Sequence, residues 1–260
     1  MPHRRSPRTW SRRTTCLAHV TREVGAPAGG SLAAVSELLA PEPSGDAVDG
    51  ELGEVVFRRV LHALRLGGFV DAPEVSRRAG LPADVVEAAL TDAVRRGWAI
   101  HRSGRLVGWN LTAEGRAEGE RLLSVQLDRT DTRALVEARY REFRALNDGF
   151  LALCTDWQLR EVDGETRIND HTDPQHDADA LRRLDATHVA ITPIVEALAG
   201  ALDRFGTYSD RFGAAVERVH AGHTEWFTKP VIDSFHTVWF ELHEDLLATL
   251  GIERATERSQ

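Results

Sequence analysis

Glycine and proline divide residues 52–125 into short segments, and this spacing restricts the possible fold more than any other feature of the chain. Residues 52–66 carry hydrophobic side chains at the 3.6-residue spacing of an amphipathic helix, which ends at the Gly-Gly pair 67–68. A second helix begins at Asp71, because Glu74 follows it at the spacing of a capping box. The pattern therefore predicts two helices joined by a short connection.

A third helix is predicted from Pro82 to Arg96. Gly80 provides the turn before it, since glycine adopts a positive φ angle without strain, and Gly97 ends it. Pro82 suits the first helical position, where a backbone N–H is not needed. The predicted buried side chains of this helix are Val86, Leu90, Ala93 and Val94.

Two short strands are predicted at residues 98–101 and 106–111, around the turn Ser103-Gly104. Thr112 then caps a further helix. Helix, helix–turn–helix, β-hairpin, helix is the order of elements in a winged helix–turn–helix domain. We place this domain at residues 50–127.

The stretch from Trp109 to Arg116, Trp-Asn-Leu-Thr-Ala-Glu-Gly-Arg, resembles the wing strand and following helix of the MarR and PadR groups of bacterial regulators. The resemblance covers about residues 52–125, which is under a third of the chain. It implies a winged helix–turn–helix that binds double-stranded operator DNA. The C-terminal half is not assigned to a family.

In this interpretation the third helix lies in the major groove of DNA, and the wing, which is the predicted β-hairpin, contacts phosphate or the minor groove. The exposed face of the third helix would include Asp84, Glu87 and Asp92, which are unfavourable beside phosphates. Arginines lie at the margins of this face, which predicts that they clamp the DNA backbone. The predicted DNA-binding residues are Arg77, Arg78, Thr91, Arg95, Arg96, Arg102 and Arg105.

Charge is unevenly distributed along the chain, whose formal net charge is −8. Residues 126–260 carry 15 basic and 25 acidic side chains, whereas residues 1–49 and 50–125 each have a net charge of +1. An anionic partner is therefore expected to contact the first 125 residues.

The C-terminal half shows helical patterns without a strand signal. Helices are predicted at residues 131–158, 178–205, 209–221 and 230–250. Residues 159–177 are a polar loop that ends in Asp177 as a helix cap, and Pro193 breaks or kinks its helix. The predicted fold class is mainly α, a winged helix–turn–helix domain followed by an α-helical bundle domain at residues 128–252.

Hydrophobic side chains define the predicted inner faces of the first and last of these helices. They are Leu135, Phe143, Leu146, Phe150, Leu153 and Trp157, and then Phe235, Val238, Trp239, Leu242, Leu246 and Leu250. Some of these aromatic residues belong either to plain core or to a ligand pocket, because aromatic walls with a few polar groups are typical of small-molecule sites. The candidate ligand-binding residues are Trp157, Asp233, His236, Thr237 and Phe240.

Histidines and carboxylates are concentrated after residue 165. The segment 169–177 holds potential metal ligands, and His236 and His243 are seven residues apart on one helix face. However, no paired ligand motif such as His-Glu-x-x-His occurs, so we predict no metal and no cofactor. A metal-binding helical bundle with His236 and His243 as ligands stays an alternative.

Other classes are excluded or disfavoured. No run of eighteen apolar residues occurs, which argues against a membrane partner. The two cysteines cannot build a disulfide scaffold, and we expect a cytoplasmic protein. The sequence contains no recognisable nucleophile elbow, phosphate-binding loop or catalytic triad, so we do not expect an enzyme.

Residues 1–49 are expected to be a disordered tail, since they combine an Arg-rich start with Pro/Gly/Ser-rich stretches. No apolar segment of signal-peptide length follows that start. A basic arm that contacts DNA, or translation that begins later in the native protein, are alternatives for this tail.

These features together predict a one-component transcriptional regulator that forms a homodimer and senses a small-molecule effector through its helical half. The alternative is a winged-helix adaptor that contacts proteins and does not bind DNA.

Overall fold

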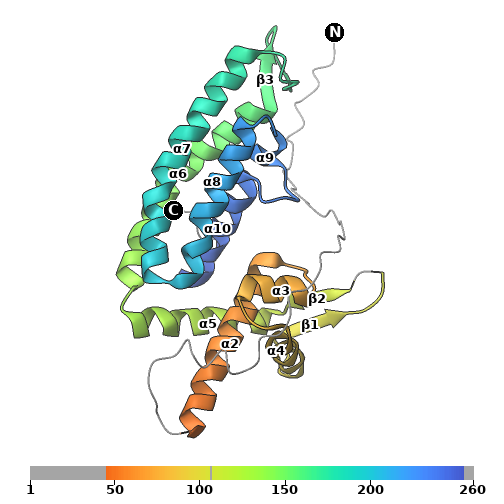
Figure 1. Ribbon diagram of the computed structural model, residues 1–260, viewed down its shortest axis with the longest axis vertical. Coiled ribbons are helices and arrows are strands. Elements are labelled where there is room, and N and C mark those ends of the chain that lie inside the picture. Colours follow the sequence, from red (N-terminus) through yellow and green to blue (C-terminus); the bar gives the residue numbers. More distant parts are fainter. Residues whose placement is uncertain (1–44, 106, 255–260) are drawn as a thin grey trace, which may run out of the picture.

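The computed structural model describes residues 45–105 and 107–254, and most of them are helical. The mainly α fold class is therefore confirmed (Figure 1). Of the predicted tail, residues 1–44 lie outside the described residues, whereas residues 45–49 are the start of a helix. Within the described residues, no helix combines the length and the apolar character needed to cross a bilayer.

The N-terminal unit consists of the elements from α2 to α5. They are α2 (Gly45–Gly67), α3 (Ala72–Ala79), α4 (Ala83–Arg95), β1 (Ala99–Arg102), β2 (Gly108–Leu111) and α5 (Ala113–Thr130). A hydrophobic cluster around Val60, Leu64 and Leu90 joins α2, α3 and α4 to the hairpin. The predicted order of elements in this part of the chain is confirmed.

Local signals in the sequence explain the ends of these helices. The Asp71 side chain accepts a hydrogen bond from the Glu74 backbone N–H at 2.9 Å, and Thr112 accepts one from Gly115 at 3.0 Å. Gly80 adopts a φ angle of 61° in the turn between α3 and α4. Both predicted caps and the predicted glycine turn are therefore confirmed.

The β1–β2 hairpin is rooted in the N-terminal unit. Ala99 pairs with Leu111 at its base, and an isolated bridge joins Val70 to Trp109. A Cβ atom on Gly115 would lie 1.8 Å from the Trp98 carbonyl oxygen. Only glycine at this position allows α5 to start so close to the base of the hairpin.

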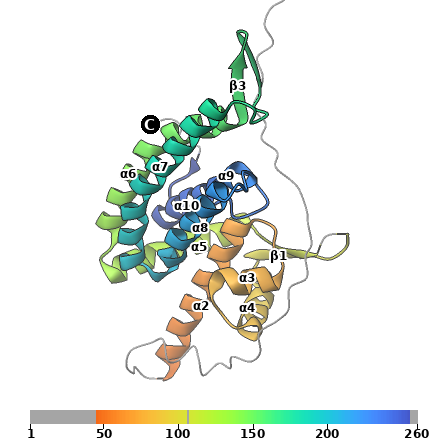
Figure 2. The same cartoon turned by 45° about the horizontal axis from the view of Figure 1, so that its top comes forward.

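The C-terminal unit consists of the elements that follow α5. They are α6 (Arg133–Gln158), β3 (Leu159–Val162), β4 (Glu165–Ile168), α7 (Pro174–Ala201), η1 (Asp203–Phe205), α8 (Gly206–His220), α9 (Glu225–Thr228) and α10 (Phe235–Leu250). The helices α6, α7, α8 and α10 pack on one another, and α10 also contacts α5 and α2 of the N-terminal unit (Figures 1 and 2).

Two predictions about residues 159–177 are wrong. Residues 159–168 form an antiparallel hairpin, and the cap of α7 is Asp173, which accepts from the N–H groups of Gln175 and His176. Asp163 and Gly164 both have positive φ angles in the hairpin turn, the conformation for which an Asp-Gly pair is suited. The strands lacked a clear hydrophobic pattern because β4 is exposed throughout.

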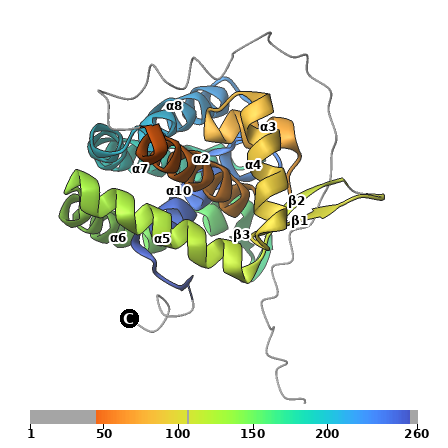
Figure 3. The same ribbon diagram turned by 90° about the horizontal axis from the view of Figure 1, so that it is seen from below.

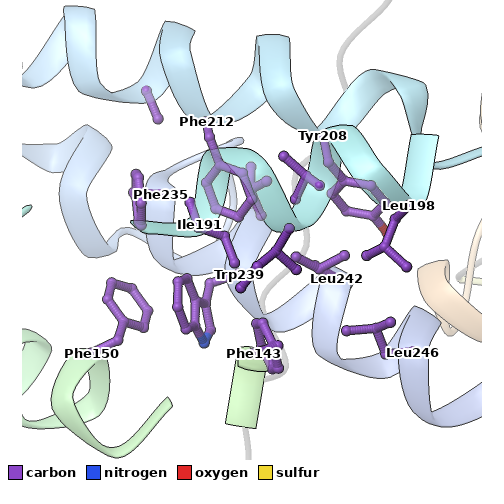
Figure 4. Packing of buried hydrophobic residues seen from close by; sticks show 14 of the residues in the cluster. Phe143, Phe150, Ile191, Leu198, Tyr208, Phe212, Phe235, Trp239, Leu242 and Leu246 are labelled. Atoms are coloured by element: carbon purple, nitrogen blue, oxygen red, sulfur yellow. The ribbon is translucent and has the colours of Figure 1, made fainter. Parts of the chain in front are cut away.

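Aromatic side chains fill the centre of the C-terminal unit, as Figure 4 shows. Phe150 and Phe212 approach Trp239 and Phe235 from α6 and α8, with ring centroids 4.3 Å apart for Phe150 and Trp239. Most predicted inner residues of α6 and α10 are buried, which confirms the helical period. The prediction that Leu135 is buried is wrong, because this side chain is 39% exposed.

Two further predictions need correction. Val94 on α4 is 40% exposed, and Ala89 is buried in its place, because the inner face of α4 is turned toward α2 and α3. Pro193 does not break its helix, because α7 is continuous from Pro174 to Ala201, so this half of the prediction of a break or a kink is wrong. The carbonyl group that loses its partner belongs to Val189, which is 74% exposed, so water can satisfy it.

Candidate nucleic-acid interface

The helix α4 presents an exposed face on the side of the N-terminal unit where the β1–β2 hairpin projects (Figure 3). The side chains of Asp84, Glu87, Thr91 and Arg95 are exposed along it. The opposite face of α4 packs on α2 and α3. This leaves a three-turn helix that is supported from behind and open in front, next to an extended hairpin.

Charge on this face is partly neutralised within α4. Asp92 binds both Arg95 and Arg96, and its Oδ2 atom lies 2.7 Å from Arg96 Nε. The hydrogen bond from Arg96 is the largest influence that lowers the pKa of Asp92, so this carboxylate stays ionised. Asp84 and Glu87 are the acidic residues of the face that lie closest to its start.

The arginines at the edges of α4 have different environments. Arg95 is 79% exposed, whereas Arg96 is 48% exposed and lies over the rings of Phe57 and Trp98. On the hairpin, Arg102 and Arg105 are exposed. Two of these guanidinium groups therefore lie at the C-terminal end of α4 and two lie on the hairpin.

Two of the predicted DNA-binding residues lie on another side of the unit. Arg77 and Arg78 project from α3 toward the C-terminal unit and line a cavity between the two units. Arg78 is 17% exposed and binds Glu74 and Glu241, the latter at 2.9 Å. The structure does not bring these two arginines together with Arg95, Arg102 or Arg105. Thr91 donates its hydroxyl to the Glu87 carbonyl.

The candidate ligand-binding residues each have their own packing partner. Trp157 is buried against Phe227 and His171, with ring centroids 4.7 and 4.5 Å away. Phe240 is 49% exposed under the Arg254 guanidinium. Neither the cavity of about 110 Å³ between the units nor one of about 10 Å³ beside α5 is lined by any candidate of the predicted set.

The polar members of that set are similarly engaged. Asp233 accepts from Arg211 at 3.1 Å, and Thr237 donates to the Lys229 carbonyl at 3.3 Å. His236 lies beside the Phe150 ring, and its burial lowers its pKa. These side chains lie near the start of α10 but are used in local contacts.

The two candidate metal ligands lie along α10 beside different aromatic rings. His236 faces Phe150, and the His243 ring lies 5.1 Å from that of Phe143. No group of three or more histidine, cysteine, aspartate or glutamate side chains with metal-binding geometry occurs in residues 45–105 and 107–254. In the 169–177 segment, Asn169 and His171 instead bind Asp177.

Sequence reasoning passed over a buried polar network between the two units. Asp245 on α10 is 1% exposed and accepts from Arg204 at 3.3 Å and from Tyr208 at 3.1 Å, and it lies 3.0 Å from His62 of α2. Burial raises the pKa of Asp245, but electrostatic attraction by His62 and Arg204 outweighs it and lowers this pKa to about 2. The signal was present, since Asp245 follows Val238 and Leu242 at spacings of seven and three residues and so lies on the apolar face of its helix.

Comparison of the chain with protein-family models, with curated protein sequences and with solved structures gives no match.

Proposed function

We propose that residues 50–127 form a winged helix–turn–helix domain that binds double-stranded DNA, followed by a helical bundle, and that the chain is a transcriptional regulator. The open face of α4 beside the projecting hairpin is the observation that carries this proposal (Figures 1 and 3). In this function α4 enters the major groove, while Arg102 and Arg105 on the hairpin contact the adjacent backbone.

The proposed interface holds DNA mainly through its margins. Arg95, Arg96, Arg102 and Arg105 supply positive charge around a helix face whose own carboxylates cannot contact phosphate favourably. Affinity would then depend strongly on salt, because each phosphate that an arginine neutralises releases counterions. In this function Thr91, which is exposed on α4, would contact a base or the sugar-phosphate backbone.

An electrophoretic shift with DNA from upstream of the protein's own gene tests this proposal. We expect a salt-sensitive complex that Arg105→Ala and Arg95→Ala each weaken. Arg182→Ala is a matched control for Arg95, because Arg182 is 70% exposed and pairs with the acidic residue three positions before it, as Arg95 does. Affinity that both interface variants retain at moderate salt would contradict the clamp.

An adaptor without DNA binding is the second candidate, and the exposed carboxylates of Asp84 and Glu87 favour it. The double variant Asp84→Asn/Glu87→Gln distinguishes the two. Removing negative charge strengthens a complex with DNA and weakens docking on a basic protein surface.

We propose further that the regulator is a homodimer, since helix–turn–helix proteins commonly read two half-sites with two copies. Large hydrophobic side chains are exposed on α6 and α7, at Leu151 and Val189, and are available for contacts between bundles. Sedimentation equilibrium across a range of protein concentrations measures this assembly. A monomer at all concentrations, together with a single-site DNA complex, would contradict it.

A further inference from the structure

A cavity of about 110 Å³ lies between the N-terminal and C-terminal units. Its walls come from α2 and α3 on one side and from η1, α8 and α10 on the other, and Figure 3 shows α3 beside α8. The charged and polar side chains that line it are His62, Arg77, Arg78, Arg204, Thr207, Tyr208, Arg211, Glu241 and Asp245. Four guanidinium groups and two carboxylates therefore line the cavity.

Carboxylates fix these guanidinium groups in position. Arg78 forms an ion pair with Glu241 at 2.9 Å, and Arg211 binds the same carboxylate at 2.8 Å and Asp233 at 3.1 Å. Arg77 is held by Glu74. Because the arginine side chains are already ordered, a ligand that contacts them loses little additional conformational entropy from the protein.

The cavity also contains a buried polar side chain without a hydrogen bond. His62 is 8% exposed, and neither of its ring nitrogens has a hydrogen-bond partner among the described residues. Its Nε2 atom lies 3.0 Å from Asp245 Oδ1, which is an ion-pair distance, so Nδ1 is the ring nitrogen that is left for a ligand. Buried polar groups in proteins nearly always have a partner, so this ring is suited to bind a polar ligand in the cavity.

We propose that this cavity binds a small anion that carries a carboxylate or a phosphate group. Guanidinium groups bind both kinds of oxyanion through paired hydrogen bonds. The cavity is smaller than the roughly 300–1,000 Å³ that surround a drug-sized ligand, which limits the occupant to a small ion or metabolite. The apolar Ala63 and Leu66 complete the wall.

The location of the cavity connects this site to the proposed DNA interface, and this connection rests on the proposed function. An anion bound there contacts α3, whose turn leads directly into α4, and at the same time α8 of the C-terminal unit. It therefore favours arrangements in which the two units are close. Affinity for DNA changes only to the extent that the anion binds one arrangement better than another.

Calorimetric titration and thermal unfolding of the full chain without DNA test the site. The probes are inorganic phosphate and acetate, with sodium chloride at matched ionic strength. We expect saturable phosphate or acetate binding that raises the melting temperature. Arg77→Gln should weaken it by about tenfold, the effect of losing one hydrogen bond to a charged group. Arg182→Gln, also an exposed arginine paired with an acidic residue, should leave binding unchanged.

A blocked cavity provides the second comparison. Thr207 lines the cavity yet is exposed, so Thr207→Phe fills space without disturbing a core position. Ala214→Phe places the same side chain at an exposed position two turns later on α8, outside the cavity. We expect Thr207→Phe to abolish anion binding and Ala214→Phe to retain it. Equal binding by both, or a non-saturating response to every salt, would overturn the proposal.

Adding DNA separates the two proposals. A protein that binds DNA but neither anion contradicts the cavity site and leaves the regulator intact. A protein that binds phosphate or acetate but no DNA supports the cavity and contradicts the regulator.

Discussion

Arginines on two sides of the N-terminal unit have opposite environments. On the side that faces the C-terminal unit, Arg65 and Arg78 are 10% and 17% exposed and pair with Glu244 and Glu241 of α10. On the other side, Arg102 and Arg105 are exposed on a projecting hairpin. The same residue type thus holds the molecule together on one surface and presents charge to solvent on the other.

The comparison teaches that partners, and not residue type, assign an arginine its role. An arginine that is buried between the two units and paired with carboxylates of the same chain is not accessible to an extended polyanion such as DNA. An exposed arginine has water as its competitor and is available to a polyanion. Variants on the two sides should therefore separate stability from DNA affinity.

The largest effect on stability is expected at the centre of the buried network. Asp245→Ala leaves Arg204 and His62 without their carboxylate in a buried position. Breaking a buried ion pair in this way costs about 3–5 kcal/mol. Urea unfolding followed by far-ultraviolet circular dichroism measures the loss. Asp84→Ala, on the open face of α4, is the control and should stay within about 0.5 kcal/mol.

Acid is expected to have the second largest effect on the free energy of unfolding, through the buried network between the two units. The pKa of Asp245 falls to about 2 on folding, so the stabilisation from this group is complete above about pH 4 and is lost as the pH falls toward 2. A shift from 3.8 to about 2 corresponds to about 2 kcal/mol. In Asp245→Asn, the total loss of stability over this pH range should be smaller by about 2 kcal/mol. Identical slopes in the two proteins would show that Asp245 has no lowered pKa.

Arg78→Ala is expected to have a smaller effect on stability. It removes the bridge from Glu74 to Glu241 and leaves a carboxylate that is 11% exposed with one partner fewer, at a cost of about 1–3 kcal/mol. Arg102→Ala on the hairpin should change stability by no more than about 0.5 kcal/mol. Paired urea titrations compare them, and similar losses in both would remove the distinction between the two sides.

For DNA affinity we expect the opposite order, with larger effects from variants on the hairpin than from variants between the two units. The same hairpin variants should have the smallest effects on stability. Arg102→Ala and Arg105→Ala should each lower the slope of log affinity against log salt by about one unit, as the loss of one phosphate contact predicts. Fluorescence anisotropy with a labelled duplex at several salt concentrations gives these slopes. If Arg78→Ala, once folded, lowers the slope as much as Arg105→Ala does, the assignment of the two sides is wrong.

Much of the N-terminal unit could be predicted because its signals are local. The carboxylate of Asp71, the hydroxyl of Thr112 and the positive φ angle of Gly80 each act within a few residues. Such features depend on chemistry that the sequence displays directly. The exposed hairpin of β3 and β4 was missed because its Asp163-Gly164 turn is local but its strands have no buried face.

The site was less predictable because its geometry depends on distant segments. Arg77 and Arg78 follow the same spacing rules as the arginines of α4, and only the position of α8 and α10 shows that they face a cavity. His62 and Asp245 come from helices at opposite ends of the described chain. A polar residue within an apolar helical stripe is a local signal, but its partner is set by tertiary packing.

The close approach at Gly115 has a mechanical consequence. Because the backbone of α5 lies against the carbonyl group of Trp98, a larger side chain at position 115 would push the start of this helix away from the base of the hairpin. The helix α5 also packs on α10 of the C-terminal unit. The helix α5 therefore forms a continuous connection from the base of the hairpin to the C-terminal unit.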